Sequence, residues 1–234
     1  MRVGETAVGS ASADQKHWYR LGAIAALALG VGYVVIIPLY ARVGAPPHGG
    51  EEWFKYLPGK TTAWWTILAI SVFTDFLYVP LALALYLALQ KVDKNAMLLA
   101  TAFVGLFVAL DLAITWSHYA SILDLYHSYT TAANEASRAG YVAAAEYASA
   151  VLATPLEIVY AIVTLSVGIL LTGCVMLKAT FSRSAAYLGL ATGILGILSL
   201  TGFNLMIIGN ALFATVWLFF VGYRFSLLSR EPSV

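Results

Sequence analysis

Four ionisable side chains stand inside long apolar stretches of the sequence: Asp75, Asp111, His118 and Glu157. A charged group within a bilayer costs at least about 2.5–3.5 kcal/mol on insertion scales, so such residues usually face the interior of a helix bundle and serve a function. Carboxylates at matched depth can exchange protons or bind a cation, and Asp, Glu and His also hold divalent metals. These residues predict a polar site within an apolar protein.

The spacing of these side chains indicates where the site lies, taking the N-terminus as cytoplasmic. At about 1.5 Å of rise per residue, Asp75 lies roughly 18 Å below the outer end of its helix and Asp111 roughly 22 Å above the inner end of its own. Asp111, Thr115 and His118 follow the i, i+4, i+7 spacing of one helix face. We predict an outward-facing pocket with Asp75 and Asp111 at its core and with His118 and Glu157 at its mouth. The candidate pocket residues are Asp75, Asp111, Thr115, His118, Glu157, Asn204 and Asn210.

Three functions are compatible with this pattern. The first is binding or movement of a small molecule, a lipid headgroup or a cation through the pocket. The second is a membrane-embedded metal-dependent hydrolase, for which Asp75, Asp111, His118 and Glu157 are the available ligands, although the spans contain one His and no HExxH spacing. The third is a scaffold or accessory subunit of a membrane complex. No cofactor is indicated, and each side chain could instead have a purely structural role.

The composition defines the class of protein. Of the 234 residues, 61% are hydrophobic and 11% are charged, whereas soluble domains contain about 45–50% and about 25%. These values exclude a soluble globular domain and a disordered chain. A net charge of +1 gives no field for nucleic acid, and the single cysteine, Cys174, excludes an intrachain disulfide. The partner that the composition predicts is the lipid bilayer.

Six apolar runs are long enough to span a bilayer, which predicts an all-α polytopic helix bundle. Gly202–Asn204 offers the only turn chemistry within the apolar run 185–223, for which one long tilted helix is the alternative. Pro80 and Pro155 lie inside two runs and predict kinks. Residues 128–150 predict an outer helix that lies on the interface or extends the fourth span. The predicted spans are 21–40, 63–89, 96–119, 151–177, 185–201 and 205–223.

Basic residues orient the bundle, and small residues suggest how it packs. With the N-terminus inside, nine Lys and Arg residues fall in cytoplasmic segments and four in outer ones, so both termini are expected in the cytoplasm. This leaves 1–20 as a cytoplasmic segment, 21–225 as one transmembrane domain and 226–234 as a cytoplasmic tail. Small residues at every fourth position of 185–193 predict helix contacts within the chain, with a second copy or with a membrane partner. The aromatic residues of 53–65 are typical of an interfacial belt.

Several short segments carry a family resemblance through a membrane-embedded Asp, a basic inner turn and a small-residue helix: 74–76, 81–87, 91–94, 171–178 and 186–189. On these motifs the chain resembles the bacterial domain-of-unknown-function 4386 family of integral membrane proteins. The resemblance implies a prokaryotic multi-pass protein of the plasma membrane without an assigned activity. The Asp in the second helix of the family maps onto Asp75, whereas Asp111 and His118 have no counterpart there.

Overall fold

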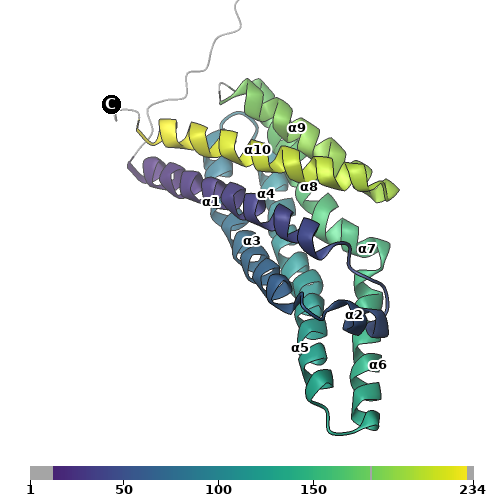
Figure 1. Ribbon diagram of the computed structural model, residues 1–234. Coiled ribbons are helices and arrows are strands. Elements are labelled where there is room, and N and C mark those ends of the chain that lie inside the picture. The colour runs from purple at the N-terminus through teal and green to yellow at the C-terminus, as the bar shows by residue number, and fades with distance from the viewer. Residues whose placement is uncertain (1–12, 180, 231–234) are drawn as a thin grey trace, which may run out of the picture.

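The computed structural model describes residues 13–179 and 181–230, and every regular element within these ranges is a helix (Figure 1). Six helical segments are long and apolar enough to cross a membrane. This finding confirms the predicted all-α bundle and is consistent with a multi-pass membrane protein. The six segments are Gln15–Val43, Thr61–Leu89, Lys94–Thr131, Pro155–Lys178, Arg183–Thr201 and Asn204–Leu228.

Five of the six predicted spans lie within these segments; the structure extends four of them by a few residues and the third by many more. The long apolar run near the C-terminus is divided as predicted, because Gly202 adopts a left-handed conformation with φ 75° that ends one helix before the next begins. The named elements of these spans are α1 (Ala13–Val43), α3 (Thr61–Leu89), α4 (Lys94–Leu110), α8 (Thr164–Lys178), α9 (Arg183–Leu198), η3 (Ser199–Thr201) and α10 (Asn204–Leu228). Residues 1–12 of the predicted N-terminal segment and 231–234 of the predicted tail lie outside the described residues.

The fourth span begins later than predicted. The helix α6 (Glu135–Leu152) ends before Ala153–Thr154, and Pro155 is the first residue of α7 (Pro155–Ile158). A proline at this position sacrifices no helical hydrogen bond, because the N–H groups of the first turn have no partner within the helix. The predicted span 151–177, with a kinking proline inside it, is therefore wrong at its start. Pro80 does lie inside α3.

The third span continues well beyond the length that a bilayer requires. Its 38 residues would extend for roughly 57 Å, against an apolar thickness of about 30 Å. After α4 the chain passes through η1 (Asp111–Trp116) into α5 (Ser117–Thr131), and α6 returns alongside α5 as the second arm of a hairpin (Figure 1). Residues 128–131 thus complete α5, and α6 is a separate helix instead of an extension of the fourth span.

The six spans form a closed ring in chain order. Each of α1, α3, α4, α8, α9 and α10 contacts the next, and α10 returns to contact α1. The stacked rings of Tyr19 and Phe225, with centroids 5.7 Å apart, place the start of α1 beside the end of α10. Both ends of the described chain therefore lie at one end of the bundle, which we call the terminal end.

Small residues allow close packing within this ring. A Cβ atom added to Gly173 of α8 would lie only 3.0 Å from the backbone nitrogen of Leu190, and one added to Gly193 of α9 would lie 2.5 Å from Cβ of Leu170. Ala185, at the start of the predicted small-residue stripe, is fully buried. The stripe of α9 therefore packs against α8 of the same chain.

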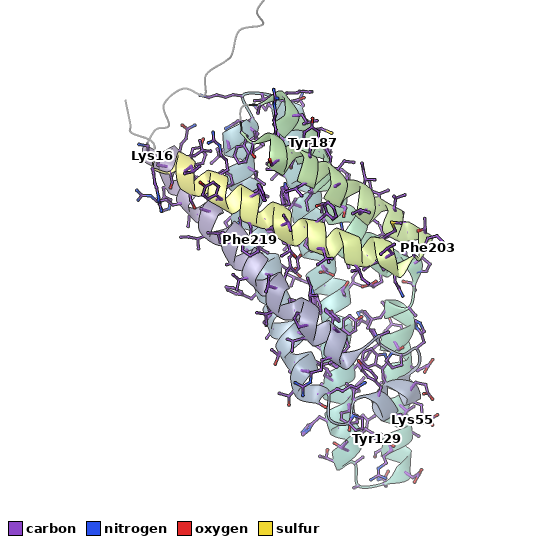
Figure 2. All side chains as sticks on the ribbon, turned by 45° about the horizontal axis from the view of Figure 1, so that its top comes forward. Lys16, Lys55, Tyr129, Tyr187, Phe203 and Phe219 are labelled. Atoms are coloured by element: carbon purple, nitrogen blue, oxygen red, sulfur yellow. The ribbon has the colours of Figure 1, made fainter. Side chains whose placement is uncertain are left out.

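The opposite end of the bundle carries a helical cap, formed by α2 (Gly50–Tyr56), α5 and α6. Figure 2 shows Lys55 and Tyr129 on the cap and Lys16 at the far end of the molecule. Trp53 and Trp64 pack edge to face under α2 with ring centroids 5.4 Å apart, and they are 1% and 0% exposed. The prediction of an interfacial belt is wrong for these two side chains, since the cap buries them; Trp65, at 43% exposure, does face outward.

Candidate intramembrane carboxylate site

Asp75 and Asp111 come from neighbouring helices and meet inside the bundle. Each is 4% exposed, although Phe73 and Phe76 beside Asp75 are about 60% exposed on the outer surface of α3. This inside-out distribution of polarity is what lipid as a solvent requires. The two carboxyl groups are neighbours that interact directly with each other. The structure thus brings together the two residues predicted to form the core of the pocket.

The hydrogen bonds at this pair are incomplete. Trp116 donates its Nε1–H to Oδ2 of Asp111 at 3.0 Å. Within the described part of the chain, Oδ2 of Asp75, Oδ1 of Asp111 and Oγ1 of Thr115 are buried and have no hydrogen-bond partner. Burying a carboxylate without a partner is costly, and two of them in contact repel each other. The site as it stands can be completed by a positively charged group.

A π-helical turn, η1, determines which side chains reach the pair. Residues five apart come together in such a turn, so Trp116 is brought over Asp111. The α-helical spacing used for the sequence prediction selected Thr115 and His118 and missed Trp116. Thr115 does lie beside Asp111. His118 binds the carbonyl oxygen of Ile114 through Nδ1 at 2.6 Å.

The ring of His118 packs against α6 of the cap. Its centroid lies 6.2 Å from that of Tyr147. Nothing in the described residues groups three or more His, Cys, Asp or Glu side chains in a geometry that could hold a metal ion. The structure therefore does not assemble Asp75, Asp111, His118 and Glu157 into the ligand set that a metal-dependent hydrolase would use.

Glu157 lies at the edge of the site. It belongs to the first turn of α7, is half-buried, and interacts electrostatically with Asp111. A second π-helical turn, η2 (Val159–Val163), follows at once and packs against η1. Thr164 donates its hydroxyl to the carbonyl oxygen of Val159 at 2.7 Å, five residues earlier in the chain. Two irregular turns therefore face each other where the acidic side chains gather, and such turns are frequent at functional sites.

Two tyrosines extend the polar site toward the terminal end. Tyr78 lies one turn beyond Asp75 on α3, and its hydroxyl shares a 2.7 Å hydrogen bond with that of Tyr33 on α1. Both phenols lie within electrostatic range of Asp75 and Asp111. The i, i+3 spacing from Asp75 could have indicated Tyr78. Nothing in the sequence distinguishes Tyr33 from the other tyrosines, of which the chain has fourteen in all.

Beyond Tyr78 the interior becomes apolar. A cavity of about 10 Å³, with room for about one water molecule, is lined mainly by hydrophobic side chains of α3, α4 and α8, among them Leu81, Leu85 and Met97. Trp217 of α10 also lines this space, and its indole N–H is buried and has no partner in the described ranges. The site accordingly ends at the tyrosine pair on this side.

The two asparagines of the predicted set lie elsewhere. Asn210 donates from Nδ2 to Oγ of Ser166 at 3.2 Å and to the carbonyl oxygen of Thr192 at 2.8 Å, and so it joins α8, α9 and α10. Asn204 is exposed at the first residue of α10. The structure does not bring either residue to the carboxyl pair, and the contacts of Asn210 are those of a helix-joining residue.

Comparisons of the chain with family models, curated proteins and solved structures gave no match. The geometry of the site alone therefore carries the functional argument.

Proposed function

We propose that the protein binds a cation, either a proton or a monovalent metal ion, between Asp75 and Asp111. The observation that supports this proposal is the pair of buried carboxyl groups in contact, each with an oxygen atom that has no partner among the described groups. A proton between the two groups removes one charge and supplies the missing hydrogen bond. A small metal ion removes the repulsion in the same way.

The number of available ligands favours a proton or a monovalent ion. Only the two carboxyl groups and the hydroxyl of Thr115 offer unpaired oxygen atoms at this point. Calcium takes six to eight oxygen ligands, and magnesium requires a nearly regular octahedron. A buried site with few oxygen atoms suits a cation that needs few oxygen ligands.

Trp116 provides a probe for the test; because the chain has six tryptophans, its emission is taken as the part of the signal that Trp116→Phe removes. Its N–H donates to Asp111, so a cation that occupies the carboxyl group weakens this bond and changes the indole emission. The purified protein is titrated with acid in sodium-free choline buffer, and then with Na⁺ or K⁺ at fixed pH. A response to acid alone identifies a proton site, whereas a saturable response to one metal ion identifies a metal site.

Variants assign the response to the pair. We expect Asp75→Asn and Asp111→Asn each to abolish the response of Trp116 while the helical content is kept. Asp93→Asn, in the exposed turn before α4, is the matched control and should leave the titration unchanged. If Asp75→Asn and Asp111→Asn both titrate as the wild-type protein does, the proposal is contradicted. It is also contradicted if the wild-type protein responds to none of the three cations.

We also propose that the protein lies in the plasma membrane of a prokaryote with both termini in the cytoplasm. The excess of basic residues at the terminal end supports this orientation. With Cys174 replaced by serine, Ser128→Cys in the cap and Arg230→Cys at the exposed terminal end provide two labelling sites. An impermeant maleimide applied to whole cells should label position 128 and not position 230, and after permeabilisation it should label both.

A further inference from the structure

We propose that Glu157 is the access residue of the site: it passes the cation between solvent at the cap end and the pair formed by Asp75 and Asp111. This inference rests on the proposed cation binding and adds the route by which the cation arrives. Of the three carboxyl groups in this region, Glu157 alone is half-buried, whereas the other two are 4% exposed. It is therefore the member that reaches both solvent and the interior.

The surroundings of Glu157 connect it to the pair. Asp111 lies within its electrostatic range, while the charge that acts most directly on Asp75 is that of Asp111. The order from solvent inward is thus Glu157, Asp111 and Asp75. Tyr40 of α1 and Tyr119 of α5 each lie within range of both Glu157 and Asp111. In the described part of the chain, the ionisable groups that interact with Glu157 are therefore one carboxyl group and two phenols, all of them acidic.

The local backbone leaves this route less regular than the rest of the bundle. Glu157 follows the non-helical residues Ala153–Thr154 and precedes η2, which packs against η1. On the side of the terminal end, the described residues that line the cavity next to Tyr78 include no carboxyl group and no basic side chain; their polar members are Thr101, Thr172 and Trp217. Cations consequently enter and leave at the cap end, past Glu157.

The test measures the rate of binding separately from its equilibrium. The full-length protein in detergent is mixed rapidly with acid, or with the metal ion identified by the titrations, and the emission of Trp116 is followed over time. Glu157→Gln should retain an equilibrium response but reach it at least about tenfold more slowly, because a positioned carboxyl group typically accelerates proton transfer by about 10²–10⁴-fold. Glu157→Asp, which keeps a carboxyl group, should restore most of the rate.

Asp124→Asn is the matched control, since it removes an exposed acid from α5 near the same end. An unchanged rate in Glu157→Gln would overturn the inference, as would an equal slowing in Asp124→Asn or a failure of Glu157→Asp to restore the rate. Complete loss of the equilibrium response in Glu157→Gln would also overturn it, because Glu157 would then belong to the binding site. If instead the proposed cation binding by Asp75 and Asp111 is wrong, the wild-type protein itself gives no response, which distinguishes the two failures.

Discussion

The cap and the bundle use acidic side chains in opposite ways. In the cap, the exposed Glu146 accepts a 2.6 Å hydrogen bond from the backbone N–H of Gly50, and Ser149 accepts one of 2.8 Å from Gly49. In the bundle, the buried Asp75 and Asp111 each have an oxygen without a partner in the described structure. Glu146 is exposed to solvent and still has a hydrogen-bond partner within the protein. Asp75 and Asp111 are shielded from solvent, yet each has an oxygen atom without a partner in the described structure.

The contrast separates a structural acid from a binding one. Buried polar groups in folded proteins nearly always have a hydrogen-bond partner, so an exception requires an explanation. Glu146 holds α2 onto α6, and its contacts account fully for its presence. The contacts of Asp75 and Asp111 do not account for theirs, and the exchangeable cation that we propose would account for them.

The largest expected effect is a gain of stability on removing charge from the pair. Asp75→Asn and Asp111→Asn each replace a repelled carboxylate with an amide that can donate to the remaining one. Because removing this repulsion and forming one hydrogen bond to a charged group are both favourable, we expect each variant to raise the free energy of unfolding by about 1–3 kcal/mol relative to the cation-free wild-type protein, measured without metal ions and at a pH above the proton-binding transition. Denaturant titration in mixed micelles measures the change, and clear destabilisation would assign the pair a structural role.

A substitution in the cap should lower stability where the substitutions at the carboxyl pair raise it. A Cβ atom at Gly50 would lie 2.5 Å from both the backbone nitrogen of Glu146 and the carbonyl oxygen of Val142, so Gly50→Ala should destabilise docking of α2 by about 1–3 kcal/mol. Faster amide hydrogen exchange in α2 would report this loss. Gly140→Ala on α6, where a Cβ meets no other group within 4 Å, is the control and should be neutral or slightly stabilising.

A change in cation affinity, in place of a change in stability, is expected from Trp116→Phe. This variant removes the hydrogen-bond donor to Asp111. In the cation-free protein the Asp111 carboxylate then has one hydrogen bond fewer, so binding a cation becomes more favourable. Since a hydrogen bond to a charged group contributes about 1.5–3 kcal/mol, cation affinity should rise roughly tenfold or more. The infrared band of the protonated carboxyl group, or calorimetry for a metal ion, measures the affinity without the indole. Weaker binding would indicate that Trp116 helps to hold the cation.

The smallest effect is expected at Asp93, a partly exposed acid that is fully paired. The backbone N–H of Ala96 and then the ammonium of Lys178, 3.4 Å away, lower the pKa of Asp93. A lowered pKa in the folded state means that the stabilisation is present at neutral pH and is lost as the pH falls through that pKa. Asp93→Asn, which keeps a good helix cap, should reduce the acid sensitivity of thermal unfolding with little change at neutral pH. A large change at neutral pH would contradict this assignment.

The sequence was sufficient for the spans and for the depth of the pair, and it failed where the helix type changes. Bilayer thickness sets the length of an apolar run, and a constant rise per residue placed Asp75 and Asp111 at one level. That rise could not reveal η1, so the contact of Trp116 with Asp111 was missed. Pro155 was predicted to kink a helix but is the first residue of α7, because the sequence does not distinguish a proline in a first helical turn from one at a kink.

The closed ring also sets the order in which the protein can be completed. The first span stacks Tyr19 on Phe225 of the last one, and Gly30 approaches the ring of Phe219. At synthesis rates of about 5–20 residues per second, the roughly 200 residues between them take about 10–40 s to make. During that interval the glycine-bearing face of α1 contacts lipid or the insertion machinery in place of α10. Assembly therefore ends with the helix that is made last, and a chain that stops before α10 leaves the ring open along its whole length.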